Sequence, residues 1–119
     1  AHGIRCYTHP DIMQRIKDSG VCLDICPKSN LDTHALHNVN SIEQYPLPVI
    51  LNAGVEVTVN TDNLAVSGTT LKKEFERLFV AGIIDEAQAQ DLVKCAISHS
   101  FISKNEKSEL WKKAKNIFK

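Results

Sequence analysis

Two segments of the chain have the pattern of a complete β-strand, and helices are predicted between and after them. The first is VCLDIC at residues 21–26. The second is VEVTVNT at residues 55–61, in which Val55, Val57 and Val59 alternate with polar residues. Strands that alternate with helices form parallel sheets through right-handed crossovers. Because two strands alone cannot cover strands that are apolar on both faces, the sequence predicts part of an α/β domain with a larger sheet.

The helices are predicted from their caps and from their apolar periodicity. Pro10 suits a first helical turn, and Gly20 suits a left-handed cap. Thr69 or Thr70 is expected to cap a later helix, and Asp85-x-x-Gln88 and Ser103-x-x-Glu106 have the pattern of capping boxes. The predicted helices span residues 10–20, 46–53, 71–82, 85–98 and 103–119. Residues 28–43 and 63–68 are expected to form loops, the first with at most one short helical turn.

The composition is that of one globular domain and argues against several classes of partner. The chain has 119 residues, of which 43% are hydrophobic and 24% are charged, which fits an ordinary folded domain. Basic and acidic residues balance at 14 each, so neither nucleic acid nor a membrane is expected as a partner. The four cysteines contain no C-x-x-C pair and are expected to be buried free thiols of a reducing compartment, which predicts a cytoplasmic location.

Polar side chains occur where each strand of the predicted sheet ends. His2 precedes the first helix, where a preceding strand would have ended. Ser29 and Asn30 follow the first complete strand, and Asp62 and Asn63 follow the second. In parallel α/β folds ligands bind at the carboxyl ends of the strands, so these groups are expected to lie on one edge. An imidazole and a carboxylate there could hold a metal-bound water.

Each of these residues also has a plain structural interpretation. Asp62 alone is more typical of a turn or a helix cap, and Ser29-Asn30 alone is typical of a loop. His34 and His37 lie three residues apart in the long loop, which is weak evidence for a metal site. Catalytic zinc needs three or more protein ligands, and the chain shows no complete set. A phospho-acceptor domain with Asp62 as acceptor would need an acidic pair on the first strand, and none is visible.

Several short motifs, in order and at the right spacing, carry a resemblance to a known family. They are His2-Gly3, LDICPKSN at 23–30, PLP at 46–48, NAGV at 52–55, VNTDN at 59–63, and Thr70, Leu71 and Glu74. Together they resemble the C-terminal third of adenosine deaminase, over essentially the whole chain. Each motif is modest alone, and their order makes the set specific. The resemblance implies that residues 1–119 are the C-terminal fragment of one (β/α)₈ TIM barrel, from the tip of strand six to the final helices.

The same resemblance implies a zinc-dependent hydrolase that converts adenosine to inosine and ammonia. Asp62 matches the family's zinc-binding aspartate. His2 matches the histidine that positions the attacking water and helps to remove its proton. Zinc makes hydroxide available at neutral pH by lowering the pKa of its water to about 7. The expected partner is therefore a small purine nucleoside, the expected cofactor is Zn²⁺, and His2 and Asp62 are the expected catalytic residues.

Asn63 departs from the family pattern, which usually has a second aspartate that contacts a purine ring nitrogen. That nitrogen is a hydrogen-bond acceptor, so an aspartate must be protonated to donate to it. An amide donates at any pH, so Asn63 is expected to keep the contact with the substrate and to remove its pH dependence. The departure leaves adenine or a modified adenosine open as the substrate.

The family's other zinc ligands and its catalytic glutamate precede the region that this chain matches. Nothing in the chain replaces them, so we expect a chain of these 119 residues alone to hold zinc weakly and not to deaminate adenosine. The alternative is a non-catalytic barrel fragment that pairs with a second copy to cover its exposed strand edges and apolar helix faces.

Overall fold

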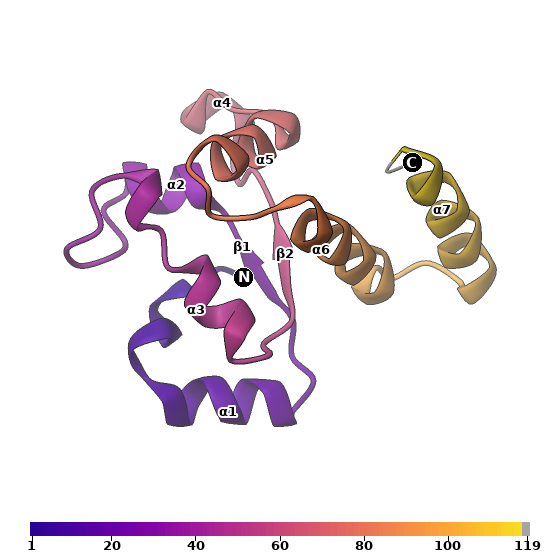
Figure 1. Cartoon of the computed structure of the whole chain (residues 1–119), viewed down its shortest axis with the longest axis horizontal. Coiled ribbons are helices and arrows are strands. Elements are labelled where there is room, and N and C mark those ends of the chain that lie inside the picture. The colour runs from indigo at the N-terminus through magenta and orange to yellow at the C-terminus, as the bar shows by residue number, and fades with distance from the viewer. Residues whose placement is uncertain (118–119) are drawn as a thin grey trace.

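A computed structural model describes residues 1–117, and a pair of parallel strands lies at its centre (Figure 1). Strand β1 (Leu23–Ile25) pairs with β2 (Val57–Val59), with Leu23 opposite Val57. The ladder extends one residue at each end, because the Leu23 N–H donates to the Glu56 carbonyl at 2.9 Å and the Asn60 N–H donates to the Ile25 carbonyl at 2.8 Å. The predicted parallel pair is confirmed, and both strands are shorter than their apolar sequence segments.

Helices surround this sheet and occupy most of the described chain (Figure 1). The helix α6 packs along β2, and α7 lies against α6 at the far side from α1. In chain order the helical elements are the 3₁₀ turn η1 (Ile4–Thr8), α1 (Pro10–Asp18), α2 (Pro27–Asp32), the 3₁₀ turn η2 (Ile42–Gln44), α3 (Leu47–Asn52), α4 (Leu64–Ser67), α5 (Leu71–Val80), α6 (Glu86–His99) and α7 (Lys104–Ile117). None of these helices is long and apolar enough to cross a membrane.

The cap predictions agree with the structure in detail. Asp85 and Gln88 form a reciprocal capping box at the start of α6. At the start of α7, the Ser103 N–H donates to the Glu106 carboxylate at 2.9 Å, and the Glu106 N–H donates to the Ser103 hydroxyl at 3.3 Å. Of the two candidate caps for α5, Thr70 is the one whose hydroxyl accepts from the Lys73 N–H.

Two segments expected to be loops contain short helices. Residues 27–32 form α2, because Pro27 takes a first-turn position where its missing N–H costs nothing. Residues 64–67 form α4, which Asn63 caps. The helix α2 begins two residues after β1 ends and contains Ser29 and Asn30, and α4 begins directly after Asp62 and Asn63. Both short helices therefore adjoin the polar residues at the carboxyl edge of the sheet.

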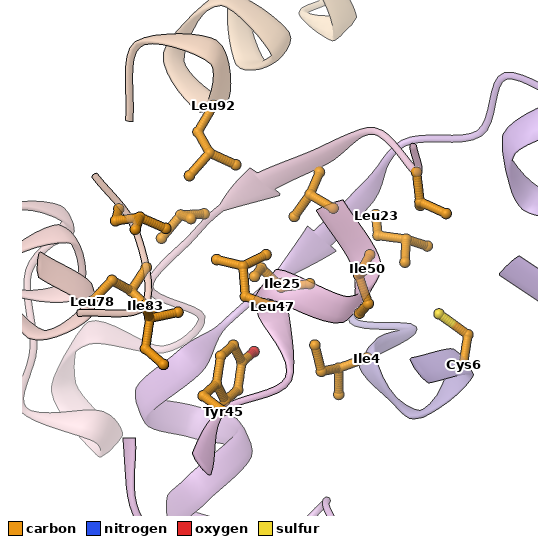
Figure 2. Close-up of a cluster of buried hydrophobic side chains, with 14 of the residues drawn as sticks. Ile4, Cys6, Leu23, Ile25, Tyr45, Leu47, Ile50, Leu78, Ile83 and Leu92 are labelled. Atoms are coloured by element: carbon orange, nitrogen blue, oxygen red, sulfur yellow. The ribbon is translucent and has the colours of Figure 1, made fainter. Parts of the chain in front are cut away.

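The hydrophobic core lies between the sheet and the helices that follow and precede it (Figure 2). The core side chains come from both strands, from η1, α1, α3, α5 and α6, and from the segments between these elements. The labelled ones are Ile4, Cys6, Leu23, Ile25, Tyr45, Leu47, Ile50, Leu78, Ile83 and Leu92. All three residues of β2 are buried, but Asp24 in β1 is exposed. The expectation that both strands are buried on both faces is therefore wrong for β1 within this chain.

Candidate active site

His2 and Asp62 lie together at the carboxyl edge of the sheet, and the same unusual backbone conformation positions both. The His2 N–H donates to the Asp24 carbonyl at 2.8 Å, as a neighbouring strand would. His2 and Asp62 each have a φ of 56°, in the left-handed region that His and Asp enter more readily than most residues. His2 Nε2 lies 3.9 Å from Asp62 Oδ2. The predicted meeting of these two side chains is thus present in the structure.

Gly3 is required beside His2 for two physical reasons. Its φ is 76°, which only glycine adopts without strain. A Cβ at this position would also lie 2.8 Å from a methyl carbon of Leu23. The His-Gly pair of the sequence therefore lets the chain turn closely over β1 as it places the imidazole at the edge of the sheet.

Ser29 anchors the carboxylate of Asp62. Ser29 is buried in α2, and its hydroxyl donates to Asp62 Oδ2 at 2.8 Å. The other carboxylate oxygen, Oδ1, accepts no hydrogen bond from any described side chain. Asp62 is thus held through one oxygen while the second remains available to a metal ion or to a proton.

Asn30 and Tyr45 orient the imidazole of His2. The buried Tyr45 hydroxyl donates to Asn30 Oδ1 at 2.7 Å, which directs the amide nitrogen of Asn30 toward His2 Nδ1 at 3.4 Å. Burial raises the pKa of Tyr45 well above its ordinary value, so this hydroxyl keeps its proton. Because Nδ1 accepts from the amide, the neutral imidazole carries its proton on Nε2, which faces Asp62.

Replacing Tyr45 with phenylalanine is expected to test this orientation. The change removes one hydroxyl and leaves Asn30 Oδ1 buried without its donor, which costs about 1–3 kcal/mol of the free energy of unfolding. It also frees the amide to rotate away from His2. Urea unfolding measures the first effect. The ¹⁵N chemical shifts of the His2 ring, which report its tautomer, measure the second when the two proteins are compared. Unchanged ring shifts would contradict the orienting role.

Cys26 joins His2 and Asp62 in a group that the sequence pattern does not single out. A ligand atom from each of the three residues lies within 4.8 Å of the other two. Burial, with a contribution from the Asp62 charge, raises the pKa of Cys26 to about 11, so the thiol is neutral at pH 7. Cys26 ends the first strand directly before Pro27, and its place at the carboxyl edge was the one available clue. Imidazole, carboxylate and sulfur are all zinc ligands, so the group fits part of a zinc site.

The raised thiol pKa values predict a loss of stability at alkaline pH. The pKa of Cys26 rises to about 11, and burial with the neighbouring Cys95 raises that of Cys22 to about 12, from an ordinary value of 9.0. A raised pKa means that the native state binds more protons than the unfolded state above pH 9. The stabilisation is therefore complete below pH 9 and is lost as the pH rises through 11 for Cys26 and through 12 for Cys22.

Urea unfolding under reducing conditions, on either side of pH 9, measures this effect. The free energy of unfolding is expected to fall steadily above pH 9, and to fall less steeply in Cys26→Ser. A stability that is level up to pH 11 would show that these thiols titrate normally in the native state.

Asn63 lies beside this group, and its side chain already has one structural role. Asn63 Oδ1 accepts from the N–H groups of Ala65 and Val66, each at 3.1 Å, and so caps α4. Its amide nitrogen, the donor that a purine nitrogen would require, makes no hydrogen bond to a described side chain. The cap and the expected substrate contact use different atoms of one amide, and the substrate contact stays a prediction.

The remaining histidines divide into two kinds. Among the described residues, no group of potential metal ligands includes His9, His34 or His37. His99 belongs to such a group, together with Cys22 and Cys95 at the other end of the strands. Sequence spacing does not reveal that group, because its members come from segments more than 70 residues apart.

An open cavity adjoins the candidate active site. Its volume is about 380 Å³, and His2, Gly3, Ser29, Asn30 and Asp62 are among the residues that line it.

A family model described as adenosine deaminase matches residues 1–117. The chain belongs to the adenosine deaminase family.

Individual relatives agree with this assignment. The adenosine deaminase of Vibrio vulnificus strain YJ016 is 36% identical over 109 residues, which are 92% of this chain and 32% of the relative. The adenine deaminase of Mesorhizobium japonicum is 33% identical over 109 residues, with 92% and 33% covered. The chain therefore spans about a third of the length of the adenosine deaminase family members that it matches.

Solved structures confirm the predicted fold. The adenine deaminase of Arthrobacter aurescens superimposes with a TM-score of 0.88 at 32% identity, over 97% of this chain and 34% of that one. An amidohydrolase of Burkholderia ambifaria, solved with bound zinc, gives a TM-score of 0.82 over 98% and 32%, and its 16% identity shows the fold alone. These neighbours are TIM-barrel enzymes, so the two strands and their helices are part of a (β/α)₈ barrel.

Proposed function

We propose that this chain supplies one side of the active site of a zinc-dependent deaminase that hydrolyses the 6-amino group of adenosine. The observation that supports this most is the His2–Asp62 pair, 3.9 Å apart at the carboxyl edge of the sheet. Both side chains are held by buried partners, and both border an open cavity. Family membership supports a hydrolytic deaminase, and the relatives include both adenosine and adenine deaminases.

Each residue has a role that its own contacts allow. Asp62 is the proposed zinc ligand through one carboxylate oxygen, and its other oxygen can accept a proton from the attacking water. His2 carries its proton on Nε2, so it can donate a hydrogen bond to the oxygen that attacks the purine carbon and stabilise negative charge there. When bound, zinc would make hydroxide available at neutral pH. Ser29, Asn30 and Tyr45 act as positioning residues for this pair.

The deamination assay compares two samples with zinc present: the 119-residue chain and the full product of the gene that encodes it. Conversion of adenosine to inosine is followed by ultraviolet absorbance, with adenine as a parallel substrate. Activity is expected in the full product and not in the short chain, because the short chain supplies only Asp62, His2 and Cys26 as potential zinc ligands at the candidate active site. Activity in the short chain would overturn the proposal that further zinc ligands are required. Conversion of adenine and not of adenosine would show that adenine is the substrate.

Replacing Asn63 with aspartate tests the proposed contact with the purine. Aspartate caps a helix as well as asparagine does, so α4 and the stability of the protein are expected to be unchanged. The new carboxyl group must be protonated to donate to a purine nitrogen. In the full gene product carrying Asn63→Asp, kcat/KM is therefore expected to fall as the pH rises through the pKa of this carboxyl group, while the parent protein shows no such step. Identical pH profiles would contradict the contact.

A second proposal concerns the 119-residue chain on its own, which we expect to self-associate. Phe101, Val80 and Val66 are almost fully exposed, and both described strands are edge strands of a two-stranded sheet. Further barrel strands would cover such edges in a longer protein, and a second copy can cover them here. Sedimentation velocity of the short chain measures this, and a monomer at all concentrations would contradict it.

A further inference from the structure

A second group of metal-binding side chains lies at the amino ends of the strands, away from the candidate active site. Cys22 directly precedes β1 and Glu56 directly precedes β2, and the parallel register places them side by side. Cys95 and His99 lie on α6, four residues apart and therefore on the same face of that helix. The packing of α6 along β2 brings these two residues to the same edge.

The distances suit a tetrahedral metal ion. Cys22 Sγ lies 3.7 Å from Cys95 Sγ, and a ring nitrogen of His99 lies within 4.8 Å of both sulfurs. Two sulfurs that bind zinc at about 2.3 Å in tetrahedral geometry are about 3.8 Å apart. A disulfide needs about 2.0 Å between its sulfurs, so the observed separation fits a shared metal and does not fit a bond.

Glu56 completes the pattern that is common around metal-binding histidines. Its Oε2 lies 2.7 Å from His99 Nε2, so the histidine can donate to the carboxylate and present its other nitrogen, Nδ1, to an ion. Such a carboxylate fixes the tautomer and the direction of the ring. A cavity of about 360 Å³, lined by Cys22 and His99 among others, adjoins the group and leaves room for a fourth ligand.

We propose that Cys22, Cys95 and His99 bind one divalent zinc-type ion, with Glu56 as the residue that orients His99. Binding displaces the two thiol protons to solvent and forms two metal–sulfur bonds and one metal–nitrogen bond. The ion would tie α6 to the start of β1, across 73 residues of sequence. This site is independent of the proposed deaminase function, because its ligands lie at the opposite end of the strands from His2 and Asp62.

The test titrates the reduced protein with Co²⁺, both as the full gene product and as the 119-residue chain. An absorption band for sulfur-to-cobalt charge transfer, with the visible bands of tetrahedral cobalt, is expected at one equivalent and should disappear on addition of Zn²⁺. X-ray absorption of the zinc-loaded chain should show two sulfurs at about 2.3 Å. A zinc coordination shell that contains only oxygen and nitrogen would overturn the proposal. This measurement requires no variant protein.

Matched variants locate the sulfurs. Cys22→Ser and Cys95→Ser are expected to lose the charge-transfer band, whereas Cys6→Ser and Asp62→Asn keep it. Glu56→Gln should keep the band and weaken zinc binding by about 10–100-fold, as expected for a residue that orients a ligand. The proposal would be overturned if the band survived in the double variant Cys22→Ser, Cys95→Ser and disappeared in Cys26→Ser. That result would show that the sulfur ligand lies at the other edge of the sheet. Circular dichroism checks that each variant is folded.

Discussion

Replacing Asp62 with asparagine in the full gene product is expected to lower kcat/KM for adenosine by about 10²–10⁴-fold, the size of effect typical of losing a group that moves a proton. The change keeps the shape of the side chain. The amide oxygen can still accept from the Ser29 hydroxyl, and asparagine tolerates a φ of 56° as well as aspartate does. What is lost is the negative charge, and with it the zinc ligand and the proton acceptor.

The measurement combines the rate of inosine formation with the zinc content of the purified protein, which is expected to fall in the same variant. Asp32→Asn is the matched control. Asp32 is about as exposed as Asp62, at 40% against 43%, and lies in α2 on the same edge of the sheet, where it pairs with Lys28. Its replacement should leave activity and zinc content unchanged. Full activity in Asp62→Asn would remove Asp62 from the proposed chemistry.

The meeting of His2 and Asp62 follows from the sequence because it depends on topology. Asp62 directly follows a predicted strand, His2 lies where a preceding strand would have ended, and the ends of parallel strands share one edge of a sheet. The sequence pattern could not provide the left-handed backbone at either residue, since His and Asp enter that region more readily than most residues and yet adopt it at only a small minority of positions. The capping boxes at Asp85 and Ser103 were predictable for a related reason, because both partners lie within one helical turn.

The residues that support the site could not be predicted from the sequence, because their contacts join positions that are distant along the chain. Tyr45 contacts Asn30 across 15 residues of mainly irregular chain, and nothing in its neighbourhood indicates that contact. Ser29 reaches Asp62 across 33 residues. The helix α2 was hidden as well, since serine and asparagine in its centre favour turns as much as helices. Tertiary packing decides such cases, and local propensity does not.

Glu74 holds α5 to α2, and it is fully buried. Its Oε2 accepts from the Lys28 N–H in the first turn of α2 at 2.9 Å. Its Oε1 accepts from Arg77 Nη1 at 2.7 Å and also pairs with the Thr69 hydroxyl. Each oxygen therefore faces hydrogen-bond donors. A carboxylate accepts on both sides, whereas a glutamine amide has only one acceptor oxygen and must point its NH₂ at a donor, whichever way it turns.

Glu74→Gln is therefore expected to lower the free energy of unfolding by about 1–3 kcal/mol, the cost of leaving a buried donor without its acceptor. The partly exposed Arg77 also loses its charged partner. Urea unfolding measures this cost. Glu76→Gln is the matched control on the same helix, because Glu76 pairs with Lys72 at 3.5 Å in solvent and such pairs contribute little. A Glu74 variant as stable as the control would show that the network carries no stability. A large loss would show why α2 keeps its place, and with it the Ser29 hydroxyl that holds Asp62.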